Sequence, residues 1–155
     1  MQIRRAEASE ASRLSELALR SKAHWGYSDD FMRACTEELT YTPEEVAAGR
    51  FHVLEDDGEV RGFYALIKIS PTAFELEAMF VEPARIGCGY GRALMEHALA
   101  EARATEHIER LVIQADPNAS RFYEAAGGRL IGERRSGSIP GRMLPLYEID
   151  FTNGR

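Results

Sequence analysis

The first 50 residues carry apolar side chains at the three- and four-residue spacing of amphipathic helices. This spacing predicts a helix over residues 8–22, with an apolar face made of Ala11, Leu14, Leu17, Ala18 and Ser21. A second helix is predicted near residues 28–39, with one side made of Phe31, Met32, Cys35 and Leu39. A third helix should begin after Thr42, which can cap it, because Pro43 suits the first helical position and Glu45 completes a capping box.

From residue 51 the pattern changes to β-branched and aromatic residues. Residues 51–55 and 60–69 flank Asp56-Asp57-Gly58-Glu59, and Asp-Gly between two such runs predicts a β-hairpin. A further strand is predicted over residues 73–81. Its alternation puts Phe74, Leu76, Ala78 and Phe80 on one face and Glu75, Glu77 and Met79 on the other.

The remaining residues alternate between helices and strands. A helix is predicted over residues 90–106, and the unbroken apolar run at 111–113 is typical of a strand buried on both faces. A short helix near 118–126 and two strands, at 128–134 and 144–151, complete the chain, and a short strand at 2–5 begins it. This order predicts a single mixed α/β domain, residues 1–155, around one central sheet.

Composition and charge exclude several classes of function. A chain of 155 residues fits one domain, and a net charge of -6 disfavours nucleic-acid binding, which relies on neutralising phosphates. The excess negative charge lies in residues 1–60, which hold 7 basic and 13 acidic residues. No apolar run approaches the roughly 18–20 residues of a membrane helix, and the start lacks a signal-peptide core. With two cysteines and no disulfide framework, we expect a cytoplasmic protein without a membrane partner.

Metal ligands are not evident from local spacing. None of His24, His52, His97 and His107 lies at a metal-ligand distance in sequence from another His or a Cys. The sequence therefore predicts no metal site.

The segment from Val81 to Leu94 contains the most informative motif. Gly87, Gly89 and Gly91 lie between a predicted strand and a predicted helix, where free N–H groups and the helix dipole favour phosphate oxygens. A P-loop would need Gly-Lys-Ser/Thr, which is absent, and the dinucleotide fingerprint would need a third glycine where Arg92 stands. A tight turn with no ligand is the plain alternative.

This segment resembles the acyl-CoA pyrophosphate loop of the GNAT superfamily of N-acetyltransferases. Gly89 and Gly91 match its two glycine positions, whereas Ile86 stands where the family usually has Gln or Arg. The resemblance implies a mostly antiparallel mixed sheet, flanked by helices and splayed at the acetyl-CoA site. It also implies that the cofactor is bound by the turn, which is Ile86, Gly87, Cys88, Gly89, Tyr90, Gly91 and Arg92.

A second segment, residues 116–128, is similar to the family's Asn-x-x-x-Phe-Tyr-x-x-x-Gly helix. By that resemblance Asn118 and Ser120 would contact the cofactor, and Tyr123 would act as the general acid at its sulfur. The alternative for Tyr123 is a half-buried core tyrosine. The family also uses backbone N–H groups of the strand before the glycine turn, here Met79, Phe80 and Val81.

Amine acetylation requires a base that removes a proton from the attacking nitrogen. Glu75 and Glu77 are candidates, because residues two apart on one strand point to the same face and partial burial raises a carboxyl pKa. A solvated strand face is the alternative, and the sequence does not choose between the two acids. Cys88 could in principle form an acyl-cysteine, but no His or Asp accompanies it at a fixed local offset.

The acceptor side is less clearly defined by the sequence. His24, Trp25 and Tyr27 lie between the first two helices, in the region that walls the acceptor pocket in the family. They form either a hydrophobic plug or an aromatic wall for a cationic amine. The acidic first 60 residues favour a cationic acceptor.

The resulting hypothesis is direct transfer of an acetyl group from acetyl-CoA to a small-molecule or peptide primary amine in a ternary complex, with no metal. The alternatives are a non-catalytic acyl-CoA-binding module and a nucleotide-dependent enzyme that uses the same turn. A homodimer is a common assembly in the family that the chain resembles.

Overall fold

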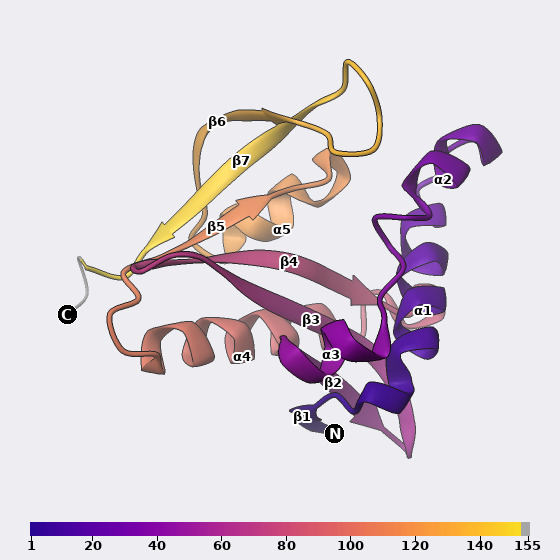
Figure 1. Ribbon diagram of the computed structural model, residues 1–155, viewed down its shortest axis with the longest axis horizontal. Coiled ribbons are helices and arrows are strands. Elements are labelled where there is room, and N and C mark those ends of the chain that lie inside the picture. Colours follow the sequence, from indigo (N-terminus) through magenta and orange to yellow (C-terminus); the bar gives the residue numbers. More distant parts are fainter. Residues whose placement is uncertain (153–155) are drawn as a thin grey trace.

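The computed structural model describes residues 1–152, and within them seven strands form one mixed sheet in the order β1-β2-β3-β4-β5-β7-β6 (Figure 1). The strands are β1 (Gln2–Arg5), β2 (Arg50–Asp56), β3 (Glu59–Ser70), β4 (Ala73–Val81), β5 (Arg110–Gln114), β6 (Arg129–Arg135) and β7 (Met143–Asp150). The helices are α1 (Ala11–Ala23), α2 (Asp29–Cys35), α3 (Pro43–Ala48), α4 (Tyr90–Ala104) and α5 (Ser120–Ala125). Of the helices described, none is long and apolar enough to span a bilayer.

Local signals in the sequence agree with the elements that form. Asp57 and Gly58 both have positive φ, 53° and 73°, as a two-residue turn between β2 and β3 requires. The capping box of Thr42 and Glu45 starts α3. The helix predicted over residues 28–39 is shorter, because it begins after the Ser28 cap and ends at Cys35.

The core has two parts, one on each face of the sheet. One contains the buried sides of α4 and α5, with Leu94 and Tyr123, and the other contains those of α1, α2 and α3, with Leu14 and Val46. The chain therefore buries both faces of its central strands, and Ile113 of β5 is 1% exposed, as its unbroken apolar run predicts.

A bulge in β4 overturns the predicted alternation of that strand. Ala78 pairs with Ala65 and Leu76 with Leu66, so Glu77 is the extra residue opposite β3. Because of this residue, Leu76 packs on the core around α4, whereas Ala78 packs on the core around α1. The prediction that Phe74, Leu76, Ala78 and Phe80 share one face is therefore wrong beyond the bulge.

The two central strands separate after a short parallel contact. β4 pairs with β5 only from Ala73 with Arg110 to Glu75 with Val112, and within the described chain residues 76–81 have no partner on β5. Figure 1 shows β5 and β4 diverging from this point. The divergence opens the sheet between its two central strands.

The packing of α4 on the sheet is expected to be a main source of stability. Leu94 is fully buried in this contact, so Leu94→Ala should lower the free energy of unfolding by about 2–5 kcal/mol through lost burial and a residual cavity. Leu99→Ala, on the same helix but only partly buried, should cost less. Urea denaturation measures both, and equal losses would contradict this account of the core.

Candidate active site between strands β4 and β5

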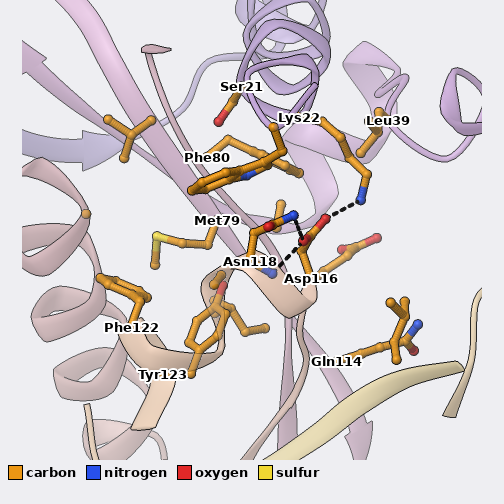
Figure 2. Close-up of a pocket in the computed structure, with 18 of the residues that line it drawn as sticks. Ser21, Lys22, Leu39, Met79, Phe80, Gln114, Asp116, Asn118, Phe122 and Tyr123 are labelled. Atoms are coloured by element: carbon orange, nitrogen blue, oxygen red, sulfur yellow. Dashed lines mark hydrogen bonds and ion pairs between the residues drawn. The ribbon is translucent and has the colours of Figure 1, made fainter. Parts of the chain in front are cut away.

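A cavity of about 800 Å³ fills the opening between the two central strands. Its wall includes the glycine turn, β4 from Glu75 to Val81, the end of α1, and parts of the β6–β7 hairpin. Figure 2 shows residues from distant parts of the chain, such as Lys22, Met79 and Tyr123, around this space. Its volume lies in the range of small-molecule sites.

The glycine turn presents backbone donors at one end of the cavity. Gly87 and Gly89 have φ of 91° and 83°, a region in which other residues are strained. The first hydrogen bond of α4 runs from Ala93 N to Gly89 O (3.1 Å), so the preceding N–H groups of the helix have no acceptor inside it. Gly91 packs close to α5, since a Cβ there would be in van der Waals contact with the ring of Phe122 at 3.4 Å.

The predicted cofactor residues of the turn divide into two groups. Ile86, Gly87, Gly89, Gly91 and Arg92 line the cavity. The exposed Cys88 and the Tyr90 side chain do not, and the Tyr90 hydroxyl donates a hydrogen bond to Asp56 instead. Ser120, at the start of α5, also lies outside the lining.

The edge of β4 provides further donors. Glu82 N donates to Arg61 O on β3 (2.8 Å). Since N–H groups alternate along an antiparallel strand, that of Phe80 also points to β3, and those of Met79 and Val81 point to the opening where β5 has diverged. Met79, Phe80 and Val81 all line the cavity.

Tyr123 lies on the cavity wall with its hydroxyl directed inward, beside Phe122 (Figure 2). The residue is only 7% exposed, and its ring meets that of Phe122 edge to face at 5.1 Å. Burial, together with the negative charge of Asp116, raises the pKa of the Tyr123 phenol above its ordinary value. The hydroxyl therefore keeps its proton at neutral pH.

Asp116, at the end of β5, organises a charged network that the sequence analysis missed. Its carboxylate accepts hydrogen bonds from the Tyr27 hydroxyl (2.7 Å), Lys22 Nζ (3.2 Å) and Asn118 Nδ2 (2.9 Å), and Arg142 lies 3.7 Å away. Burial opposes ionisation, but these bonds and the Asn118 N–H outweigh it and hold the pKa of Asp116 below its usual range.

The side chain of Asn118, which was predicted to contact the cofactor, belongs to this network. Its side-chain amide donates to both Asp116 and Tyr27, while the residue lines the cavity (Figure 2). Asn118 is thus fixed in place by residues of the chain, and its amide oxygen is the group left to face the cavity.

Glu75 and Glu77 both line the cavity, but their surroundings differ. Arg134 of β6 donates to Glu75 Oε1 (2.7 Å) and also to Gln114, so Glu75 is held in an ion pair. Glu77, on the bulge, is exposed to the cavity and has no ion-pair partner among the described residues. Desolvation, followed by the like charges of Glu45 and Glu75, raises the pKa of the Glu77 carboxyl.

The predicted aromatic wall is only partly present. Trp25 lines the cavity and is 45% exposed. His24 contacts Trp25 edge to face (5.2 Å) but lies outside the lining, and Tyr27 stacks on Phe31 at 4.0 Å, with its hydroxyl in the network of Asp116.

Three charged residues of the site, Asp116, Arg134 and Arg142, were not predicted from the sequence. Asp116 could have been found, because it closely follows the carboxyl end of a predicted strand. Nothing in the local sequence around Arg134 or Arg142 indicates that they reach the site.

Comparison with known proteins agrees with this geometry. The model of the acetyltransferase (GNAT) domain family matches residues 47–127. A 5-NmdU N-acetyltransferase of Pseudomonas phage PaMx11 is 30% identical over 148 residues, which cover 94% of this chain and 96% of that protein. The chain therefore belongs to the GNAT acetyltransferase family, and it is an acetyltransferase.

Two further similarities extend this assignment. The peptidyl-lysine N-acetyltransferase YiaC of Escherichia coli is 30% identical over 132 residues, 83% of this chain and 84% of that protein. The structure of the PaiA N-acetyltransferase of Thermoplasma acidophilum, in complex with coenzyme A, superposes with a TM-score of 0.78 at 19% identity over 97% of this chain and 98% of that one. The predicted fold, a mixed sheet flanked by helices in a single α/β domain, is confirmed.

The network around Asp116 should contribute to stability in a pH-dependent way. Asp116→Asn leaves the cations of Lys22 and Arg142 without their counter-charge and should lower the free energy of unfolding at pH 7 by about 1–3 kcal/mol. Since folding lowers the pKa of Asp116, this stabilisation is full above the unfolded value of about 3.9 and is lost as the pH falls through the folded value. Urea denaturation should therefore show a constant difference between the two proteins from pH 7 down to about pH 5, and a difference that shrinks as the pH falls further.

Asp30→Asn provides the matched control, because the Asp30 side chain is 88% exposed on α2. It should change stability little at either pH. A loss for Asp116→Asn that stays constant down to pH 3 would contradict the assigned role of its charge.

Proposed function

We propose that this chain transfers an acetyl group from acetyl-CoA to a primary amine by direct attack in a ternary complex. The observation that carries the proposal is the cavity itself. It joins the donors of the glycine turn to two groups of suitable chemistry, the Tyr123 hydroxyl and the Glu77 carboxylate. One space thus holds the parts that acyl transfer to an amine requires.

The residues present fit an acyl-CoA. The N-terminus of α4 and the glycines before it offer N–H groups to phosphate oxygens, and Arg85 and Arg92 line the same end of the cavity. The free edge of β4 runs from this end toward Tyr123 and can accept the amide groups of an extended arm as a strand would. The relative from Thermoplasma acidophilum was solved with coenzyme A, which supports the same ligand here.

Glu77 is the better candidate for the base. Glu75 is held by Arg134 and would have to break that ion pair to accept a proton. Glu77 is open to the cavity, and its raised pKa brings it nearer to that of an effective base at neutral pH. We infer that Glu77 accepts the proton of the attacking amine, directly or through one water.

Acyl transfer also requires a donor to the thioester oxygen and an acid that protonates the leaving sulfur. We infer that β4 provides the donor and Tyr123 the acid. The N–H groups of Met79 and Val81 can donate to the thioester oxygen as it becomes negative. The Tyr123 hydroxyl, protonated at neutral pH, can donate its proton to the sulfur as the carbon–sulfur bond breaks. The products are then the N-acetylated amine and CoA with a protonated thiol.

The charge of the cavity favours a cationic acceptor. Of its cations, Lys22 and Arg142 are paired with Asp116 and Arg134 is paired with Glu75, whereas Arg85 and Arg92 lie at the end proposed for the phosphates. Among the described residues, the wall carboxylates Glu38 and Glu77 are in no ion pair. The relative named for peptidyl-lysine acts on a side chain of this charge class, which supports the proposal.

The assignment of the base can be tested by comparing two variants. Glu77→Gln should lower kcat by about 10²–10⁴-fold and remove the acidic limb of the pH–rate profile, which reports the raised pKa of Glu77. In the wild type, kcat/KM should rise with pH through that limb, because the base works when deprotonated. Glu75→Gln, the matched control, should retain the limb. If Glu75→Gln removes the limb and Glu77→Gln does not, the assignment is wrong.

The reaction itself can be tested by measuring CoA release from acetyl-CoA with a panel of acceptors. We expect turnover with polyamines or a lysine peptide and none with acidic amines. Tyr123→Phe should lower kcat by about 10²-fold with little change in affinity for CoA. A wild-type protein that binds CoA without turnover on any amine would favour the acyl-CoA-binding module, and turnover only with acidic amines would overturn the cationic acceptor.

A further inference from the structure

A second polar cluster lies outside the cavity, between β2 and α4. It consists of His52 on β2 and of His97 and Glu101 on α4. One ring nitrogen of each histidine and one oxygen of Glu101 all lie within 4.8 Å of one another. None of the three residues lines the cavity, so the proposed acetyl transfer makes no use of them.

His52 is an unusual residue for a buried position. It is 7% exposed, and its Nδ1 is buried without a hydrogen-bond partner among the described residues. Its ring stacks on Tyr64 with centroids 5.1 Å apart and lies 5.1 Å from the ring of His97. The buried Nδ1 of His52 is therefore a polar atom that lacks the partner such atoms normally have.

His97 is oriented by a hydrogen bond to a buried neighbour. Its Nδ1 lies 2.7 Å from the hydroxyl of Tyr64, which is fully buried. This contact occupies Nδ1 and leaves Nε2 as the free nitrogen of His97. Metal-ligating histidines commonly donate the N–H of their second nitrogen to a partner, and the Tyr64 oxygen can accept from Nδ1–H of His97 when Nε2 binds an ion.

Glu101 completes the cluster from the same face of the helix. It follows His97 by four residues, so the two side chains are neighbours on α4. Glu101 is exposed, so its carboxylate can move toward the histidines without disturbing the core. Its negative charge also offsets Arg5, which lies next to His52 in the sheet and donates to Gly49 O.

We propose that His52, His97 and Glu101 form a binding site for a divalent transition-metal ion of the zinc class. Two imidazole nitrogens and one carboxylate oxygen suit Zn²⁺, Co²⁺ or Ni²⁺ and disfavour Mg²⁺, which prefers oxygen ligands. The three ligands leave one position of a tetrahedral ion for water. Ligands about 2.0–2.1 Å from one ion lie closer together than 4.8 Å, and the exposed Glu101 is the ligand that is free to move to meet this distance.

Such an ion would link β2 to α4 in the folded chain. His52 and Glu101 come from elements far apart in the sequence, so the complete ligand set exists only after folding. Binding should therefore stabilise the folded state in proportion to the metal concentration. The site is separate from the cavity, and a failure of the proposed acetyl transfer would leave it unaffected.

The test is titration of the metal-free, full-length protein with Zn²⁺ by calorimetry, with thermal unfolding measured in parallel. We expect one Zn²⁺ per chain, a rise in Tm with Zn²⁺ and none with Mg²⁺. Glu101→Gln, an exposed change that should leave folding intact, should weaken binding by about tenfold or more, and Tyr64→Phe should weaken it by about 10–100-fold through loss of the His97 partner.

Two controls separate this site from chance binding. His107→Asn removes an exposed histidine away from the cluster, and Cys88→Ser removes the exposed thiol; neither should change Zn²⁺ affinity. A Co²⁺ complex should lack a thiolate charge-transfer band. Absence of Zn²⁺ binding at millimolar concentrations, or binding that Glu101→Gln and His97→Gln leave unchanged, would overturn the proposal.

Discussion

The site depends on how early the pairing of β4 and β5 ends. Parallel strands normally continue side by side, and their hydrogen bonds would use the donors of both edges. Here the pairing stops at Glu75 and Val112, so the following residues of β4 keep a free edge inside the protein. A buried free edge is costly unless a ligand or water pairs with it. The same feature that weakens the sheet therefore creates a place for an extended ligand.

The bulge at Glu77 acts together with this divergence. In a regular strand Glu77 would face away from Leu76 and Ala78, and Ala78 and Phe80 would lie on the same face as Phe74. With it, Ala78 faces the core around α1, and Met79 packs with the core around α4, next to the residues near Tyr123. The bulge thus aims the donors and the carboxylate into one cavity.

Local features of the site could be predicted from the sequence, and long-range ones could not. The hairpin at Asp57-Gly58 and the glycine turn follow from backbone preferences of a few adjacent residues. The bulge in β4 depends on its register with β3, which alternation alone does not reveal. The same holds for the pairing of His52 with His97, since two residues with 44 positions between them in the sequence show no local sign of contact in space.

The charge of the site shows why net charge along a sequence is an indirect guide. Of the 13 acidic residues in positions 1–60, Glu38 is the one on the cavity wall within the described chain. The wall's other carboxylates are Glu75 and Glu77 of β4 and Asp116, which follows β5, and Arg134 and Arg142 pair with two of them. In a partly desolvated cavity, neighbours within a few ångströms decide the interaction of a charged group. The expectation of a cationic acceptor therefore rests on Glu38 and Glu77, the two wall carboxylates that have no counter-charge among the described residues.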